Sequence, residues 1–209
     1  MKIPPSFYTG DDVVAIARDL LGKVLCTRID GLMTRAIITE TEAYAGVDDR
    51  ASHAFGGRRT GRTEPMFGPG GFAYVYLCYG IHHLFNVVTN EKDVPHAVLV
   101  RAGSPLEGLD LMLSRRGKEK EDRSLLGGPG SLAKALGITT GHTGVSLLGN
   151  RIWIEDESIR ISDDMITIGP RVGVDYAGED AARPYRFLID PAELRLPVSA
   201  KARSNPTAA

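Results

Sequence analysis

Two glutamates and a tyrosine stand at alternate positions in the segment Glu40-Thr-Glu-Ala-Tyr44. In an extended strand alternate side chains share one face, so Glu40, Glu42 and Tyr44 point the same way. A carboxylate at the end of an apolar strand, beside an aromatic ring, can activate a water molecule next to a flat ligand. A charged edge strand would carry the same glutamates, and the spacing does not say which carboxylate would be catalytic.

Three more tyrosines lie in the segment Tyr74-Val-Tyr-Leu-Cys-Tyr-Gly80, which has the composition of a strand. Tyr74 and Tyr76 share a face, and Tyr74 is most simply a strand-forming residue, because β-structure favours tyrosine. Tyr79 falls on the other face, and Gly80 ends the strand beside it, so we expect Tyr79 to protrude. A protruding tyrosine can enter a base stack and fill the gap left by an extruded nucleotide.

Residues 45 to 71 are expected to form a long loop rich in glycine and arginine. Between residues 50 and 63 the loop has no acidic residue, and its cations are Arg50, Arg58, Arg59 and Arg62. Such a cluster indicates an anionic partner, either nucleic-acid phosphates or a small phosphorylated ligand. His53 lies in the same loop and is either a polar loop residue or, near Tyr44 and Tyr76, a wall of a stacking slot.

Asn86 and Arg101 lie on probable strands, where each would be costly to bury alone. Asn86 can read a base edge by hydrogen bonding or by bulk. Arg101 can hold a carboxylate, a water or a phosphate, and the alternative is a buried salt bridge with Glu40 or Glu42. No metal or cofactor is expected, because the adjacent His82 and His83 diverge in a strand and the two cysteines have no metal-ligand spacing.

The elements that must hold these residues follow from local patterns. A helix is predicted over residues 11–21, with Thr9 as its cap and Gly22 as its end. A second helix is predicted to begin near Pro105 with Ser104 as its cap, and a third to end at Gly137. Strands are predicted over residues 23–28, 35–43, 74–80, 84–88, 97–101, 151–155, 165–168 and 185–189.

Because these strands follow one another without strict alternation with helices, we predict an α+β fold. The expected architecture is a single domain over residues 1–197, with a curved, mainly antiparallel sheet and peripheral helices. Residues 198–209 are small and polar and are predicted to be a flexible tail.

Length and charge limit the classes of function. The chain has 209 residues, of which 43% are hydrophobic, and 25 basic residues face 26 acidic ones for a net charge of -1. A wholly basic DNA-coating protein is therefore excluded, whereas a nucleic-acid enzyme with its positive charge on one face is not. No apolar signal core or membrane-length run is present, so we expect a cytoplasmic protein.

Several separated motifs, in order, resemble those of one family. The strings are TETEAY (39–44), ASHAFGGRRTGRTEPMF (51–67), AYVYLCYG (73–80), LVRAGSPLEGL (99–109), GGPGSLAKALGI (127–138) and RVGVDYAGE (171–179). They resemble the alkyladenine, or 3-methyladenine, DNA glycosylase family over nearly the whole chain. The resemblance implies cleavage of the N-glycosidic bond of alkylated and deaminated purines, after these bases are flipped from duplex DNA.

The resemblance also implies roles for individual residues. Glu42 matches the glutamate that activates the attacking water, and Arg101 and the Val172 carbonyl match the groups that help hold that water. The aromatic walls of the base pocket match Tyr44, His53 and Tyr76. Asn86 matches the pocket asparagine that disfavours guanine, and Tyr79 matches the residue inserted into the duplex. The implied partner is double-stranded DNA with a damaged purine, bound by a monomer that lacks a catalytic lysine and leaves an abasic site.

Two other classes of function remain open on the residues alone. One is a non-catalytic nucleic-acid-binding module, in which the arginines and tyrosines bind a strand and Glu42 is incidental. The other is a small-molecule nucleoside or glycoside hydrolase that uses two carboxylates. The arginine-rich loop and the protruding tyrosine are features that a small substrate does not require.

Overall fold

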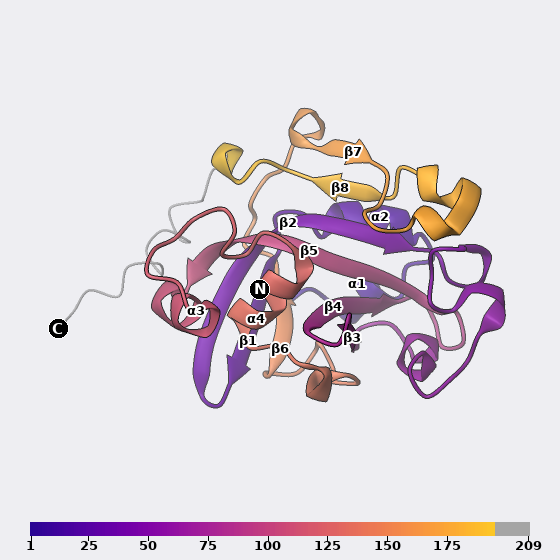
Figure 1. Cartoon of the computed structure of the whole chain (residues 1–209), viewed down its shortest axis with the longest axis horizontal. Coiled ribbons are helices and arrows are strands. Elements are labelled where there is room, and N and C mark those ends of the chain that lie inside the picture. The colour runs from indigo at the N-terminus through magenta and orange to yellow at the C-terminus, as the bar shows by residue number, and fades with distance from the viewer. Residues whose placement is uncertain (195–209) are drawn as a thin grey trace.

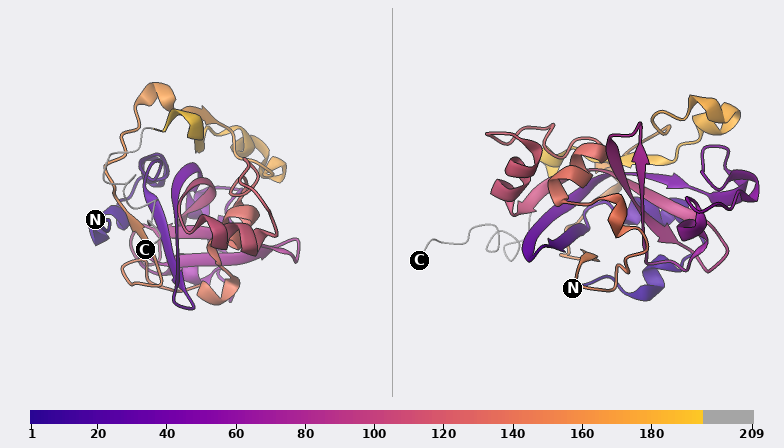
Figure 2. Two further views of the ribbon diagram at one scale, coloured as in Figure 1. Left: turned by 90° about the vertical axis from the view of Figure 1, so that its left-hand side faces the viewer. Right: turned by 60° about the horizontal axis from the view of Figure 1, so that its bottom comes forward.

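One antiparallel sheet organises the computed structural model, which describes residues 1–194 (Figure 1). Its strands are β1 (Val24–Ile29), β2 (Leu32–Tyr44), β3 (Ala73–Cys78), β4 (His82–Thr89), β5 (His96–Glu107), β6 (Ile152–Glu155), β7 (Thr167–Gly169) and β8 (Arg186–Leu188). The order across the sheet is β3-β4-β5-β2-β1-β6, and β8 pairs with both β2 and β7. The sheet curls strongly, which confirms the predicted α+β class with a curved antiparallel sheet (Figure 2).

The helices are short and lie around this sheet. They are α1 (Pro5–Tyr8), α2 (Val13–Asp19), α3 (Leu109–Arg116) and α4 (Pro129–Leu136). Short 3-10 segments occupy Gly46–Asp48, Phe55–Gly57, Glu64–Phe67, Thr140–His142, Asp163–Met165 and Pro191–Glu193, and a longer one, kinked at Gly178, occupies Asp175–Ala182. In Figure 1, α4 lies in front of the sheet and α2 behind it; α2 packs on β2, β5 and β8, whereas α4 packs on β4 and β5.

Apolar side chains from both sides of the sheet form the main core. α2 contributes Val13, Ile16 and Ala17, and α4 contributes Leu132 and Leu136, all of which are buried. Burial of the apolar face of each helix stabilises the fold by about 25 cal/mol per Å² of apolar surface removed from water. This explains why such short helices are stable here. None of the helices within residues 1–194 has the length and apolar character needed to cross a bilayer.

Two of the predicted helix starts are wrong. α2 is capped by Asp12, whose carboxylate accepts from the amides of Val14 and Ala15 at 2.9 Å. Thr9 instead follows α1 and its hydroxyl donates to the carbonyl of Ser6, so it is not available as the cap of α2.

The predicted flexible tail, 198–209, and the last residues of the predicted domain lie outside the described residues.

The second wrong start concerns Ser104 and Pro105. β5 continues through both residues, which pair with Ile37 and Ala36 of β2, and α3 begins only after Gly108 at a φ of 80°. Long-range pairing with β2 therefore overrides the local capping pattern. A proline is accommodated because β4 pairs with β5 only up to Leu99, which leaves one side of β5 without a strand at this point.

Candidate active site

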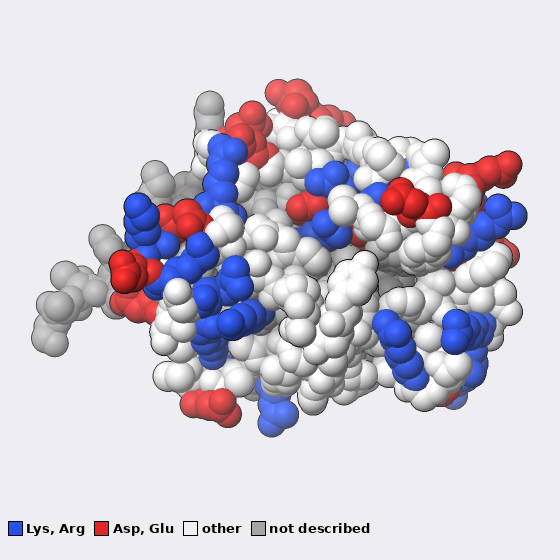
Figure 3. Space-filling model, in the orientation of Figure 1, with Lys and Arg blue, Asp and Glu red and all other residues white. Residues whose placement is uncertain are grey.

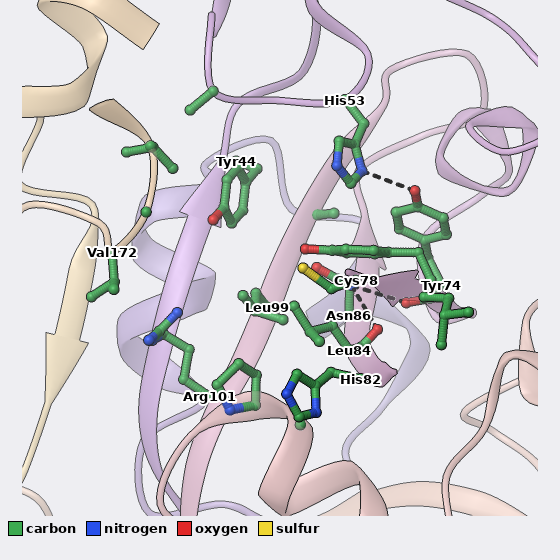
Figure 4. Close-up of a pocket in the computed structure, with 18 of the residues that line it drawn as sticks. Tyr44, His53, Tyr74, Cys78, His82, Leu84, Asn86, Leu99, Arg101 and Val172 are labelled. Atoms are coloured by element: carbon green, nitrogen blue, oxygen red, sulfur yellow. Dashed lines mark hydrogen bonds between the residues drawn. The ribbon is translucent and has the colours of Figure 1, made fainter. Parts of the chain in front are cut away.

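A cavity of about 620 Å³ opens beside the ends of β2, β3 and β5. Its lining includes Tyr44, His53, Tyr76, Asn86, Arg101 and Val172. Figure 4 labels all of these except Tyr76 and shows the labelled side chains converging from the sheet, the 45–71 loop and the segment that carries Val172. Six of the residues singled out from the sequence therefore meet in one place, although they span 129 positions of the chain, from 44 to 172.

Glu42 lies directly beneath this cavity and is fully buried, at 0% exposure. Its Oε2 accepts a hydrogen bond from the Tyr44 hydroxyl at 2.8 Å, and its Oε1 accepts one from the Val172 amide at 2.7 Å. Arg101 Nη1 lies 3.3 Å from the same Oε1. The carboxylate does not itself line the cavity, but Tyr44, Arg101 and Val172 all do. A water can reach Glu42 from the cavity only if one of these groups moves.

The hydroxyl of Tyr44 is held in its protonated, donating form. Burial is the largest cause that raises the pKa of Tyr44 well above its usual value, and the negative charge of Glu42 is the next. The ring is also fixed from behind, because the guanidinium of Arg171 lies 4.9 Å from its centroid. The alternation of Glu42 and Tyr44 predicted from the sequence is thus realised as a direct hydrogen bond.

Arg101 joins the two carboxylates of the motif. Its Nε donates to Glu40 Oε1 at 2.7 Å while its Nη1 faces Glu42, so the salt-bridge alternative applies to both glutamates. Burial on its own would lower the pKa of Arg101. The negative charges of Glu42 and Glu40 outweigh this effect and raise the pKa above its usual value. Its position results from an irregular register: Val100 pairs with Thr41, whereas Ala102 pairs with Glu40. Arg101 is therefore the extra residue of a β-bulge, a feature that redirects side chains at functional sites.

Aromatic rings form the opposite wall. The His53 and Tyr76 rings meet edge to face with centroids 4.6 Å apart, and Tyr74 lies 5.6 Å from Tyr76. Tyr74 is buried in the sheet, as expected of a strand-forming residue, and its hydroxyl lies 3.0 Å from His53 Nδ1. Burial, followed by the charges of Arg62 and Arg58, lowers the pKa of His53 to about 4. The ring is consequently neutral at pH 7.

Asn86 is buried in the floor of the cavity. Its amide nitrogen donates to the carbonyls of Tyr74 at 3.0 Å and Leu84 at 3.2 Å. Both N–H groups are thereby committed to the backbone, which fixes the orientation of the amide and leaves its oxygen as the group available to a ligand.

Tyr79 protrudes as predicted, but it does so from a turn rather than from a strand end. β3 stops at Cys78, and Tyr79 has a φ of 50° in the left-handed region that a bulky residue rarely adopts. Its side chain is 90% exposed, and the neighbouring Ile81 is 71% exposed. Two large apolar side chains thus stand at the tip of the β3–β4 hairpin, next to the cavity.

The arginines of the loop do not behave as one group. Arg59 forms ion pairs with Glu64 and Asp93, both at 2.7 Å, so the expectation of uncompensated charge is wrong for this residue. Glu64 lies just after the acid-free segment, whereas Asp93 comes from a different loop. Three others, Arg50, Arg58 and Arg62, line a second cavity of about 350 Å³ that shares His53, Arg62 and Tyr176 with the first. Figure 3 shows positive side chains gathered beside the hollow on this side of the molecule.

A buried ion pair behind the site was not predicted from the sequence. Arg171 and Asp49 have fully buried side chains, and Arg171 Nη2 lies 2.8 Å from Asp49 Oδ1. Burial opposes ionisation, but the hydrogen bond from Arg171 holds the pKa of Asp49 below its usual value. Arg171 also donates to the Ala43 carbonyl at 2.9 Å, which ties the segment that carries Val172 to the end of β2. No local sequence signal links residues this far apart.

Metal-ligating side chains are dispersed. Within residues 1–194 no three His, Cys, Asp or Glu side chains are arranged to hold a metal ion. Cys26 and Cys78 are both free thiols, and Cys78 lines the main cavity. The groups that meet at the site are carboxylate, guanidinium, phenol, imidazole, amide and thiol groups, together with the backbone.

Comparisons with known proteins identify the family of the chain. The family model described as "Methylpurine-DNA glycosylase (MPG)" matches residues 6–193. A protein of Chlamydia felis named "Putative 3-methyladenine DNA glycosylase" is 47% identical over 189 residues, which cover 90% of this chain and 96% of that protein. A Bacillus cereus protein of the same name is 46% identical over 198 residues, covering 91% of this chain and 96% of its own length. The chain therefore belongs to the methylpurine-DNA glycosylase family of DNA-repair enzymes, which hydrolyse N-glycosyl bonds.

Proposed function

We propose that this glycosylase flips an alkylated or deaminated purine out of duplex DNA into the main cavity and hydrolyses its N-glycosidic bond with a water activated by Glu42. The observation that supports this most directly is the Glu42 carboxylate, which is buried against two hydrogen-bond donors and one guanidinium that line a cavity walled by aromatic rings. A catalytic carboxylate and a stacking slot for a flat base are thereby adjacent.

Base binding draws on the aromatic wall. Alkylation places positive charge on the purine, and each ring over a cationic base contributes roughly 0.5–2 kcal/mol of cation–π attraction. Tyr44, Tyr76 and the neutral ring of His53 supply this wall without adding a cation. Asn86, with its oxygen free, would select among purines by their exocyclic groups.

Extrusion of the base costs a few kcal/mol, and less for damaged or mispaired bases. Tyr79 would offset part of this cost by occupying the vacated space in the stack, because its ring is almost entirely exposed at the hairpin tip. Arg50, Arg58 and Arg62 would hold phosphates of the DNA on the loop side of the cavity.

As the glycosidic bond breaks, the sugar acquires oxocarbenium character. An ionised Glu42 stabilises this positive charge and accepts a proton from the attacking water. The Val172 amide and Arg101 orient the carboxylate, and the hydroxyl of Tyr44 gives way to the water when the purine enters. The role of the Val172 carbonyl as a further contact to that water stays a prediction. No lysine of residues 1–194 lines the cavity, and we expect the product to be an abasic site in an uncut strand.

The proposal is tested with a duplex that contains one hypoxanthine or one 1,N6-ethenoadenine. Incubation with the protein followed by alkali should break the labelled strand at the lesion, and breakage without alkali would contradict monofunctional chemistry. Glu42→Gln should reduce base release by about 10²–10⁴-fold, the usual contribution of a general base, while lesion binding is kept. An active Glu42→Gln variant would remove the assigned role.

One matched control variant checks the role of Glu42, and two further measurements separate the other classes of function. Glu107→Gln changes another strand glutamate that pairs with an arginine, Arg35, and it should release bases at the wild-type rate. Hydrolysis of free nucleosides would favour the small-molecule hydrolase. Binding of lesion DNA without any release would favour the non-catalytic module.

A further inference from the structure

Glu40, the first carboxylate of the motif, is held between two arginines. Its Oε1 accepts hydrogen bonds from Arg101 Nε and from Arg186 Nε, each at 2.7 Å. The side chains of Glu40, Arg101 and Arg186 are 14%, 12% and 28% exposed. With Glu42 they form a cluster of two carboxylates and two guanidiniums, so the charges of this largely buried group balance.

The branching of the sheet creates this arrangement. β2 pairs with β1 up to Ile37, and β8 takes the place of β1 at residues 40–42. Arg186 of β8 stands directly opposite Glu42 and shares its face of the sheet, but its Nε hydrogen-bonds with Glu40 rather than with Glu42. The bulge at Arg101 brings a second arginine to the same oxygen from the other side. Both neighbours of β2 thus contribute one cation to Glu40.

Glu40 thereby controls what Arg101 can offer to Glu42. With Nε bound to Glu40, Arg101 presents Nη1 to Glu42 at 3.3 Å, which is a longer contact than either bond to Glu40. Without Glu40, two like-charged guanidiniums would face a single carboxylate. Arg101 would then be free to turn and pair more closely with Glu42, in the two-point geometry that arginine and carboxylate favour. Such a pair would compete with the attacking water for the carboxylate oxygens of Glu42.

We infer that Glu40 is a positioning residue of the glycosylase reaction: it clamps Arg101, with the help of Arg186, so that Glu42 stays available to the attacking water. The inference rests on the proposed function, since it assigns Glu40 a part in the activation of water by Glu42. Glu40 itself touches neither the cavity nor the substrate, because neither its side chain nor that of Arg186 lines the cavity.

The first experiment measures single-turnover release of hypoxanthine from duplex DNA. Glu40→Gln should slow release about 10–100-fold, because small misplacements of catalytic groups cost up to about 10²-fold. Affinity for the lesion duplex should change less than about threefold, since the aromatic wall and Tyr79 are untouched. Glu107→Gln, the matched control, should match the wild type in both measurements. Release by Glu40→Gln at the wild-type rate would overturn the inference.

A double-mutant cycle distinguishes positioning through Arg101 from a general loss of structure. If Glu40 acts through Arg101, then Glu40→Gln should cost little more in an Arg101→Gln background, because residues that act as a unit are not additive. Two full and additive losses would refute the clamp. Glu40→Asp, which keeps the charge, should recover part of the rate lost in Glu40→Gln.

Folding and the proposed function are tested separately. Thermal melting shows whether the Glu40→Gln variant folds. If it does not fold, the Arg186→Gln variant takes its place, because it removes the second cation bound to Glu40. Arg186→Gln should slow base release by less than the roughly 10–100-fold expected for Glu40→Gln. An Arg186→Gln variant with the wild-type rate would then count against the clamp. The proposed function fails only if the wild type releases no base or if Glu42→Gln stays active, and neither result depends on Glu40.

Discussion

The hydroxyl of Tyr44 donates a hydrogen bond to Oε2 of Glu42 across 2.8 Å, and this contact closes the carboxylate off from the cavity. Of the three partners of Glu42, one is a backbone amide and one is a guanidinium that is hydrogen-bonded to Glu40. Tyr44 is the partner whose hydroxyl we expect to give way to the water as a base stacks on its ring. In the free protein the Glu42 carboxylate is therefore shielded.

Replacement of Tyr44 tests this shielding. Tyr44→Phe keeps the ring but removes a hydrogen bond whose net value is about 0.5–1.5 kcal/mol, so single-turnover base release should equal the wild type or exceed it by up to about tenfold. Tyr44→Ala removes the wall as well and should release bases at least about tenfold more slowly. If Tyr44→Phe is as slow as Tyr44→Ala, the hydroxyl is required for catalysis and does not act as a shield.

Tyr79 should matter for lesion recognition and not for stability. Stacking of an aromatic side chain on a base is worth about 1–3 kcal/mol, so Tyr79→Ala should weaken binding to lesion DNA roughly tenfold or more. Because the side chain is 90% exposed, the melting temperature should not fall. Tyr79→Phe should retain binding. Equal affinities of the wild type and Tyr79→Ala for a hypoxanthine duplex would exclude insertion of this ring.

His53 should make stability depend on pH. Its pKa is about 4 in the folded protein, against an ordinary value of 6.5, so between these values the unfolded chain binds more protons. The stability that comes from the neutral ring is fully present above pH 6.5 and is lost as the pH falls towards 4; its size is on the order of 2 kcal/mol. Urea unfolding at pH 7.5 and pH 5 should show this loss in the wild type. His53→Gln should lack it, and parallel curves for the two proteins would contradict the prediction.

Asp49 and Arg171 should be essential to the folded state. Removal of one partner from a fully buried pair leaves an uncompensated charge, so Asp49→Asn should destabilise the protein by about 3–5 kcal/mol in denaturant unfolding. Asp122→Asn breaks the exposed ion pair with Lys118 and serves as the control, with little change expected. A mild effect of Asp49→Asn would mean that the pair can be replaced by neutral hydrogen bonds.

Arg58 and Arg59 are adjacent but should affect DNA binding differently. Arg58 has no carboxylate partner among the described residues and lines the second cavity, whereas Arg59 is engaged by Glu64 and Asp93. Arg58→Ala should lower DNA affinity and reduce the slope of log K against log salt by about one. Arg59→Ala should change the slope less and should lower the melting temperature instead. The reverse pattern would show that the ion pairs of Arg59 give way to phosphates.

Local patterns predicted most of the strands, the third helix and the shared face of Glu42 and Tyr44. Strand alternation and glycine stops are properties of neighbouring residues, so they can be read without knowledge of the fold. The capping pattern at Ser104 failed because pairing between β5 and β2 is long-range and outweighs a local hydrogen bond. The choice of Glu42 over Glu40 came only from the family resemblance.

The supporting ion pairs could not be predicted in the same way. Arg186 and Asp49 are ordinary charged residues in the sequence, and only the fold decides that one meets Glu40 and the other meets Arg171. Their partners lie more than a hundred positions away in the chain, beyond any periodicity. Compensation of Arg59 was missed for a related reason, since Asp93 reaches it from a different loop.

The pairing of β8 with the Glu40–Glu42 end of β2 has a consequence for protein synthesis. During translation Glu42 leaves the ribosome early, but the Val172 amide that binds it and the Arg186 guanidinium behind it are made more than a hundred codons later. A polypeptide that stops before residue 172 therefore contains Glu42 without the Val172 amide, and one that stops before β8 lacks the Arg186 guanidinium behind it. We therefore expect excision of bases to require a polypeptide that is almost complete.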